Sequence, residues 1–443
     1  MSSTTVTRHY PKIKELVRRT SGDLPQIALD AQVFGRAMLE KLLPVSPADP
    51  KLISSAHGAI SHLLMSIPAY AVKPDGGQTN PIAAAYRDLL SKLPPTVKYT
   101  VLTHASVEST VKQWFKTAGL NSVEVLTVPD HLHFSVWAQD GYVVVKDVAS
   151  GETYFVEPFE FPRYADGLIA DFVSNSTALN HTQAPLYFQG GNVLIGDDFF
   201  FIGADYPANS LKYINRVIIP AQGEKPVDTV HRLYREYMDK TRTLHYIGST
   251  IPVPSEATRN IVIDGEQWTE VLYMGNKQGT VQPLFHIDMF ITLAGRDTAG
   301  KYQVVVGDPS LAANALGVTL WPHSMQEVFD NIAKGLQKLG FSVTRNPLPL
   351  AYADDPSTKE RLWYFATANN ALVQITESGE RNVWLPAYGF GNWTALAETD
   401  RANVTVWESL GFKATLLTDF HPFAENLGAV HCIQKYLGRG QET

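Results

Sequence analysis

Residues 401–417 read RANVTVWESLGFKATLL and contain the pattern that recurs through most of the chain. The apolar residues of 401–410 have helical spacing, and Gly411 supplies the left-handed conformation that commonly ends a helix. The apolar run at 412–417 has the composition of a strand. A helix that leads through a glycine into a strand is typical of α/β proteins.

A helix followed by a strand occurs at three earlier places along the chain, and Gly119 and Gly340 are expected to end the helices at two of them. Helices are predicted over 107–117, 230–239 and 325–339, followed by strands over 123–128, 244–248 and 341–344. Between them lie paired apolar runs that indicate hairpins, such as 142–146 with 153–158. At least four ββαβ-like units of unequal length therefore predict an α/β fold that is a pseudo-symmetric array around a centre.

The first 95 residues differ from the rest. Their apolar spacing predicts helices over 30–43, 50–65 and 81–93, separated by proline-containing segments. We therefore predict a helical N-terminal extension over residues 1–95, packed on a main α/β domain over residues 96–443.

Composition excludes several classes of protein. The chain has 443 residues, of which 44% are hydrophobic and 18% charged, and this balance excludes intrinsic disorder. A net charge of -7 argues against a nucleic-acid surface. No run of 18 apolar residues occurs, so no membrane span is expected. The basic N-terminal segment contains no apolar core of a secretory signal, and a cytoplasmic protein is expected.

The chain contains a single cysteine, Cys432. It therefore cannot form an internal disulfide or a cysteine-based metal cluster. No cofactor and no metal are expected from the sequence, and a homo-oligomer remains an open option.

Four stretches place polar residues within or beside apolar runs. They are FSVWAQDG at 134–141, FQGGNVL at 188–194, LFHIDMF at 284–290 and LGAVHC at 427–432. If 284–290 is a strand, His286 and Asp288 project from the same face. A buried carboxylate needs a partner or a cationic ligand, so this pair is either a structural ion pair or part of a site.

The other polar residues also allow a structural interpretation. Asp140 precedes a glycine and would cap a turn, and Asn192 follows two glycines and would adopt the left-handed conformation. A lone Cys432 is either an inert core residue or, in its loop setting beside His431, a nucleophile.

Taken together, the four stretches resemble the guanidino-group-modifying superfamily, the five-bladed α/β propellers (penteins) that include agmatine and protein-arginine deiminases. The family order W-x-x-D, G-G-N, H-x-D and H-C matches motifs beginning at Trp137, Gly190, His286 and His431. The resemblance covers residues 98–438. The stretch NNALVQI with VWLPAYG, at 369–389, is similar to the segment that precedes the nucleophile in these families. Residues 137–140 have the W-x-Q-D form of protein-arginine deiminases.

The resemblance implies a hydrolase that acts on an arginine-like guanidino group and releases ammonia and a ureido product. A guanidinium is always charged and presents a planar fork of donors, so facing carboxylates suit it. Asp140 and Asp288 would bind it, Cys432 would attack its central carbon, and His286 would transfer the protons. The remaining expected substrate-binding residues are Trp137, Gln139, Gln189 and Asn192.

The sequence departs from the family pattern at two places. Gln189 replaces the glutamate of E-G-G-N, and Ile433 to Lys435 replace the residues that usually follow H-C. Amidinotransferase and dihydrolase activities use the same side chains and stay open. Two other classes also stay open, namely a catalytically silent binding module and a metal-dependent hydrolase in which His131 and His133 join His286 and Asp288.

The sequence leaves the substrate open among free arginine, agmatine, a modified arginine and an arginine within a protein. Because the expected extension has apolar faces suited to packing on the main body, we expect it to rim a closed site. A closed site suits a free guanidino metabolite, a small-molecule partner.

Overall fold

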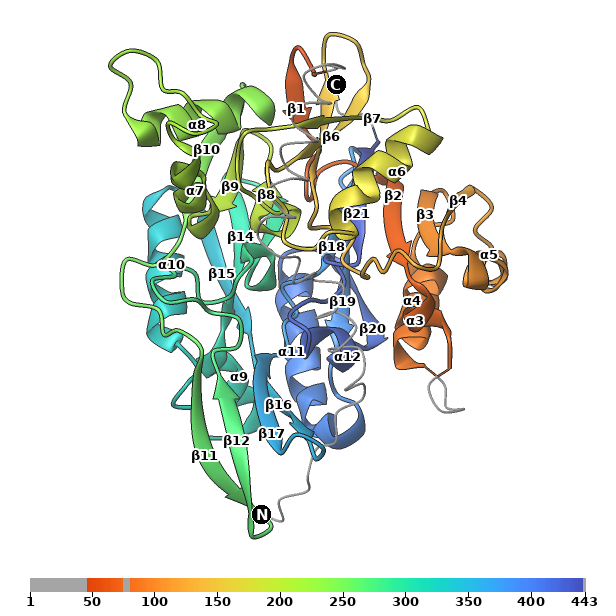
Figure 1. Ribbon diagram of the computed structural model, residues 1–443. Coiled ribbons are helices and arrows are strands. Elements are labelled where there is room, and N and C mark those ends of the chain that lie inside the picture. The colour runs from red at the N-terminus through yellow and green to blue at the C-terminus, as the bar shows by residue number, and fades with distance from the viewer. Residues whose placement is uncertain (1–45, 75–79, 441–443) are drawn as a thin grey trace. The chain divides into compact units, whose positions relative to one another are not determined.

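The computed structural model describes residues 46–74 and 80–440, and within them the chain is a mixed α/β protein (Figure 1). The helix expected over 30–43 lies outside the described residues. None of the described helices is both long and apolar enough to cross a membrane. The described chain divides into two compact units. Unit 1 comprises Pro74–Lys92 and Ile247–His431, and unit 2 comprises 46–73, Leu93–Tyr246 and 432–440.

Unit 2 contains both strands and helices. They are β1 (Pro50–Leu52), β2 (Ile60–Ile67), α3 (Ala69–Val72), β3 (Lys98–His104), α5 (Glu108–Thr117), β4 (Val123–Val128), β5 (Val143–Asp147), β6 (Thr153–Glu157), α6 (Ile169–Ser176), β7 (Asn180–Gln183), β8 (Val193–Ile195), β9 (Phe199–Gly203), α7 (Asp205–Ser210), α8 (Pro226–Tyr237), β10 (Thr243–Ile247) and β21 (Gln434–Arg439).

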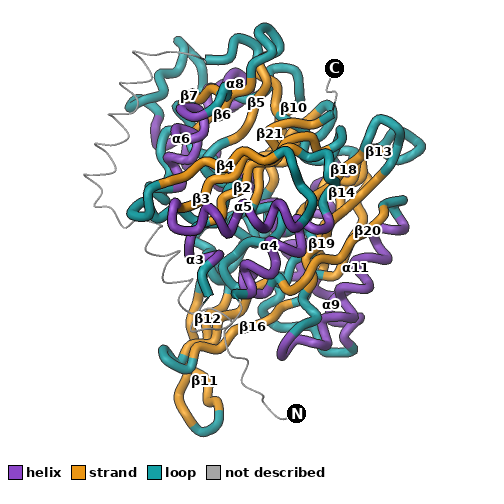
Figure 2. The backbone as a smooth tube through the Cα atoms, turned by 90° about the vertical axis from the view of Figure 1, so that its right-hand side faces the viewer, coloured by secondary structure: helices purple, strands orange, loops and turns teal. Residues whose placement is uncertain are grey.

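The sheets of unit 2 combine an antiparallel pair with a parallel strand. In the sheet β1-β5-β6-β7, β5 and β6 are antiparallel, and β7 joins β6 in parallel after the crossover helix α6. In the sheet β21-β2-β3-β4, β21 is antiparallel to β2, whereas β3 and β4 are parallel to it. Helix α5 packs on β3 and β4 (Figure 2). The third sheet has the order β10-β9-β8, with β8 and β9 antiparallel.

Unit 1 contains the remaining elements. They are α4 (Pro81–Lys92), β11 (Ala257–Ile263), β12 (Glu266–Leu272), β13 (Ile291–Arg296), β14 (Tyr302–Asp308), α9 (Pro309–Leu316), α10 (Gln326–Lys338), β15 (Ser342–Pro347), β16 (Leu350–Asp355), β17 (Glu360–Phe365), β18 (Leu372–Ile375), β19 (Arg381–Ala387), α11 (Ala397–Ser409), β20 (Lys413–Asp419) and α12 (His421–Ala424).

Two sheets of unit 1 repeat the same pattern and a third does not. In β13-β14-β15 and in β18-β19-β20, an antiparallel hairpin is followed by a helical crossover to a parallel strand. Helix α11 covers β19 and β20 (Figure 2). The third sheet, β11-β12-β17-β16, joins two hairpins through the parallel pair β12 and β17 (Figure 1). It therefore stands outside the repeated pattern.

Glycines end three of the predicted helices as expected. Gly119, Gly340 and Gly411 directly follow the last turns of α5, α10 and α11, and their φ angles are +73°, +98° and +83°. A residue with a Cβ is rarely found in this conformation, so glycine fixes the point at which each helix ends. The structure confirms these three helices, together with α8, α4 and the β5–β6 hairpin.

The helix predicted over 50–65 is wrong. This segment contains β1 and most of β2, and β2 lies between β21 and β3 in its sheet. Leu63, Leu64 and Met65 are consecutive and all completely buried. A central strand covered on both faces is apolar at nearly every position, so its periodicity does not distinguish it from a buried helix.

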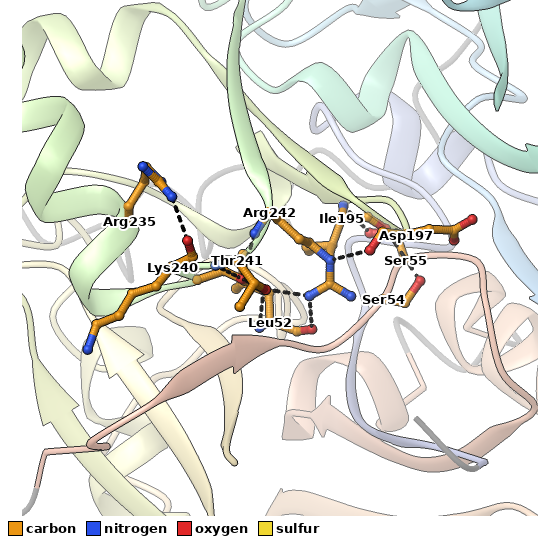
Figure 3. Close-up of polar contacts among 10 residues, drawn as sticks. Leu52, Ser54, Ser55, Ile195, Asp197, Arg235, Lys240, Thr241 and Arg242 are labelled. Carbon is orange, nitrogen blue, oxygen red and sulfur yellow. Dashed lines mark hydrogen bonds and ion pairs between the residues drawn. The ribbon is translucent and has the colours of Figure 1, made fainter. Parts of the chain in front are cut away.

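A buried ion pair stabilises unit 2 close to the end of β1. The Arg242 guanidinium donates to Asp239 Oδ2 at 2.6 Å. It also donates to the carbonyl oxygens of Leu52 and Asp197 at 2.9 and 3.1 Å (Figure 3). Burial alone would raise the pKa of Asp239, but Arg242 and the hydroxyl of Thr241 hold this pKa below its usual value. The cluster joins three segments that are distant in sequence.

Replacing Asp239 with asparagine is expected to lower the free energy of unfolding by about 3–5 kcal/mol, because it leaves the Arg242 cation buried without its counter-charge. Denaturant unfolding of the full chain measures this loss. Glu398→Gln is the matched control, because Glu398 pairs with Arg401 at the surface and such pairs contribute little. Equal midpoints for the two variants would contradict the assigned role of the cluster.

Candidate active site

The eight residues expected to form the site divide between the two units. His286 and Asp288 belong to unit 1, and the other six belong to unit 2: Trp137, Gln139, Asp140, Gln189, Asn192 and Cys432. The division falls at the peptide bond between His431 and Cys432.

In unit 2, Asp140 is buried and paired with an arginine. The carboxylate is at the end of the loop between β4 and β5, and its Oδ2 accepts a hydrogen bond from Nη2 of Arg163 at 2.6 Å. Nε of Arg163 donates to Asp166 Oδ2, also at 2.6 Å. Asp166 in turn accepts the backbone N–H of Ser135 at 2.6 Å. One guanidinium therefore joins two carboxylates and connects the Asp140 loop to the segment before α6.

The charges of this pair are mutually dependent. Burial by itself would lower the pKa of Arg163, but Asp140 and Asp166 raise this pKa above its ordinary value. The Arg163 side chain is only 12% exposed. A buried cation of this kind is stable only with its counter-charges in place. The loop that carries Asp140 therefore already binds a guanidinium, that of the chain's own arginine.

The G-G-N stretch packs directly against the Asp140 loop. The N–H of Gly190 donates to the Asp140 carbonyl oxygen at 2.9 Å, and Nε2 of Gln139 donates to the Gly190 carbonyl oxygen at 3.2 Å. A Cβ on Gly190 would lie 2.5 Å from the Tyr142 carbonyl oxygen and 2.6 Å from Nζ of Lys435. Only glycine allows so close an approach.

Asn192 and Gln189 are both buried in this region. The Nδ2 group of Asn192 donates to the carbonyl oxygen of Gly203 in β9 at 3.1 Å. Asn192 is in the short 3₁₀ turn Gly190–Asn192 and has no positive φ, so the left-handed conformation expected for it is wrong. Gln189 precedes the same turn. This turn brings both side chains to the start of β8.

Cys432 lies in a turn, two residues before β21, and is only 2% exposed. The backbone N–H of Gln139 donates to the Cys432 carbonyl oxygen at 3.2 Å. Trp137 is 5% exposed and belongs to the same loop as Gln139. The only cysteine of the chain therefore lies beside the loop that carries Asp140.

In unit 1, Asp288 pairs with a different histidine from the one expected. Its Oδ2 lies 2.8 Å from Nδ1 of His431, and both side chains are buried. His286 and Asp288 are not on a strand, since Ile287–Met289 forms a 3₁₀ turn that leads into β13. The argument that both side chains project from one strand face is therefore wrong. His286 is completely buried and stacks on Phe285 with ring centroids 3.9 Å apart.

Asn370 connects the two parts of this arrangement. Its Oδ1 accepts the N–H of Ala429 at 3.0 Å, its carbonyl oxygen accepts the N–H of His431 at 3.3 Å, and its Nδ2 donates to the Asp288 carbonyl oxygen at 3.5 Å. Asn370 thus fixes the segment that carries His431 relative to the Asp288 turn within unit 1. Asn370 is the second asparagine of the NNALVQI stretch, and the sequence alone did not indicate a role for it.

Sequence reasoning also missed Arg163, the partner of Asp140. It lies 23 residues after Asp140, and no motif marks it. His431 was visible as the histidine of H-C, but its pairing with Asp288 joins residues 143 positions apart. Such partners are set by the fold and leave no local pattern.

The structure does not support the alternative metal site. His131 and His133 are exposed. Among the described residues, the group of His, Cys, Asp and Glu side chains close enough to hold an ion consists of Glu157, Asp171 and His181. None of these three is a residue expected in the site.

Comparison with known proteins shows a fold in common with enzymes of one kind. No family model matches the sequence, and no curated protein matches it. Among solved structures, a putative agmatine deiminase is 11% identical, with a TM-score of 0.59 over 90% of this chain and 98% of that chain. The agmatine deiminases of C. jejuni and Enterococcus faecalis are each 12% identical, with TM-scores of 0.55 over 88% of this chain and 97% of theirs.

Proposed function

Since the chain has the fold of agmatine deiminases, we propose that it hydrolyses the guanidino group of an arginine-like small molecule. The reaction releases ammonia and leaves a ureido product, through a covalent amidino-thioether on Cys432. One observation carries this proposal: the sole cysteine is hydrogen-bonded to the loop whose carboxylate, Asp140, already binds a guanidinium. The fold and the ordered motifs support the same reaction.

The first step is recognition of the substrate cation. A guanidinium offers five N–H donors in a plane, and each carboxylate accepts two of them. Asp140 and Asp288 are buried carboxylates, each at 4% side-chain exposure or less. Each is held at one oxygen, Asp140 by Arg163 and Asp288 by His431. In the proposed complex the two acids bind the substrate guanidinium together and orient its central carbon toward the thiol.

The second step is attack by the thiolate. The Cys432 sulfur forms a bond to the guanidinium carbon, and the C–N bond to the departing nitrogen breaks as His286 protonates that nitrogen to give ammonia. His286 then removes a proton from water, which attacks the same carbon. Cleavage of the C–S bond returns the thiol and releases the ureido product. The His431–Asp288 pair holds the carboxylate in position during both halves.

We also propose the finer architecture of the fold. Of the six sheets in the described residues, five combine an antiparallel pair with a further strand across a helical crossover. We infer that these five sheets form the blades of one closed propeller. We also propose that the protein is cytoplasmic. Repetition of one unit five times is the pattern that such an array requires.

A panel of free guanidines, assayed for ammonia, urea and released amine, tests the reaction. A deiminase releases one ammonia per substrate and neither urea nor free amine. A dihydrolase releases more than one ammonia per substrate. An amidinotransferase releases an amine only when an acceptor amine is present. The same panel includes arginine within a peptide. A higher kcat/KM for the peptide would contradict a small-molecule substrate, and the absence of turnover on every guanidine would contradict the enzyme.

Replacing Asp288 with asparagine is expected to lower kcat/KM about 10- to 150-fold. The substitution removes a charged hydrogen bond to the cation, which contributes about 1.5–3 kcal/mol. Steady-state kinetics on the best guanidine of the panel measures the loss, with Glu398→Gln as a surface control. Unchanged kinetics in the Asp288 variant would exclude this carboxylate from binding the substrate.

A further inference from the structure

Unit 1 contains an aromatic pocket that the proposed chemistry does not use. It encloses about 320 Å³ of atom-free space, part of it open to solvent. Its walls include Tyr273, Trp363, Tyr364, Met274, Met325 and His323. At neutral pH none of the described residues that line this pocket carries a formal charge, apart from the titratable imidazole of His323. The pocket is therefore suited to an uncharged group.

The sheet that stands outside the repeated pattern builds much of this pocket. Trp363 and Tyr364 are in β17, and Tyr273 directly follows β12. The repeated hairpin-and-crossover pattern is complete without the sheet β11-β12-β17-β16. Two further lining residues, Leu284 and Leu427, lie two positions before His286 and four positions before His431. The pocket thus adjoins, along the chain, both histidine-bearing turns of unit 1.

His323 brings unsatisfied hydrogen-bonding capacity into this apolar setting. The residue is 7% exposed, and within the described chain neither ring nitrogen has a hydrogen-bond partner. Its ring meets Trp363 edge to face, with centroids 4.5 Å apart. Burial lowers the pKa of His323, so the neutral ring offers one donor and one acceptor. A buried polar group left unpaired is destabilising, and a ligand atom can supply the missing hydrogen bond.

Backbone strain gathers around the same pocket. Tyr273, Met325 and Leu427 have φ angles of +55°, +55° and +66°. Residues with a Cβ seldom adopt this conformation, and such residues cluster at ligand-binding sites. They form half of the six non-glycine residues with positive φ in the described chain. The pocket walls are therefore held in an arrangement that local preferences oppose.

We infer that this pocket binds the tail of the substrate, and that the substrate is a guanidine whose tail is aromatic or apolar and ends in a hydroxyl or amide. The inference rests on the proposed function and names its substrate class. The carboxylate of arginine would have no counter-charge among the lining residues. The ammonium of agmatine would gain less from an aromatic face than the cost of removing that ammonium from water.

The pocket must widen to accept such a tail. The space in the pocket that is available to the centre of a water molecule is about 20 Å³, which is room for one water. Met274 and Met325 line the pocket. Because methionine is unbranched and flexible, rotation of these two side chains opens space at small cost. The tail hydroxyl would then pair with a ring nitrogen of His323.

Equilibrium binding to the full-length Cys432→Ser variant tests the inference without turnover. The ligands are 4-hydroxyphenethylguanidine, phenethylguanidine and agmatine, measured by titration calorimetry. We expect the hydroxylated ligand to bind at least tenfold more tightly than agmatine. We also expect His323→Phe to remove its advantage over phenethylguanidine, about tenfold, whereas the control His231→Phe, a half-buried histidine of α8, leaves that advantage unchanged.

The outcomes separate this inference from the proposed function. Equal or tighter binding of agmatine, or an unchanged ligand preference in the His323 variant, would overturn the inference while the deiminase chemistry stands. Absence of turnover in the wild type, with the expected binding order intact, would overturn the chemistry and leave the pocket assignment. The comparison of three ligands on the parent protein does not depend on whether the His323 variant folds.

Discussion

Replacing Cys432 with serine is expected to reduce kcat on the best guanidine by at least about 10⁴-fold, with the fold intact. A thiol with a pKa near 8.5 supplies some thiolate at neutral pH, whereas a serine hydroxyl supplies essentially no alkoxide. Loss of the nucleophile in other covalent enzymes costs a factor of this order or more. The substitution changes one atom of a 2% exposed residue, so little packing is lost.

Two measurements together test this prediction. Ammonia release is followed for the wild type and for the serine variant, and circular dichroism with denaturant unfolding verifies the fold. In parallel, a haloacetamidine should alkylate Cys432 in the wild type, and a guanidine substrate should slow the labelling. A serine variant that keeps a tenth of the activity would exclude the covalent mechanism. Stoichiometric labelling without turnover on any guanidine would instead indicate a silent binding module.

The sequence was most informative where one local rule controls the structure. Gly119, Gly340 and Gly411 end their helices because each needs a positive φ, a requirement visible in the sequence itself. The interpretation failed for 50–65, where burial on both faces of β2 gives an apolar run with no helical or strand period. It failed again at His286, where a 3₁₀ turn replaces the expected strand.

The partners of the candidate catalytic residues could not be predicted. The motifs identified Asp140 and Asp288, but Arg163 and His431 are brought to them by tertiary structure. A short motif reports a residue type at a fixed spacing, whereas an ion pair between distant residues leaves no spacing to detect. Arg163 changes the interpretation of Asp140, because that carboxylate serves both a structural pair and the proposed recognition of substrate.

Replacing Arg163 with methionine is expected to lower the free energy of unfolding by about 3–5 kcal/mol. Methionine retains much of the side-chain length but removes the cation that Asp140 and Asp166 share, and two carboxylates are then buried close together without it. Denaturant unfolding measures the loss. The free energy of unfolding of Arg163→Lys should lie between those of the wild type and Arg163→Met. An ammonium keeps the charge but lacks the planar fork that reaches both carboxylates.

The double variant Arg163→Met with Asp140→Asn separates the structural role of Asp140 from its proposed role in binding. Removing both charges of the pair leaves fewer uncompensated groups, so the double variant should unfold with a higher free energy than Arg163→Met alone. Its activity should nevertheless stay at least tenfold below wild type, because the substrate guanidinium has lost one of its two carboxylates. Recovery of stability together with near-normal kcat/KM would show that Asp140 only holds its loop, and substrate recognition would then have to rest on Asp288.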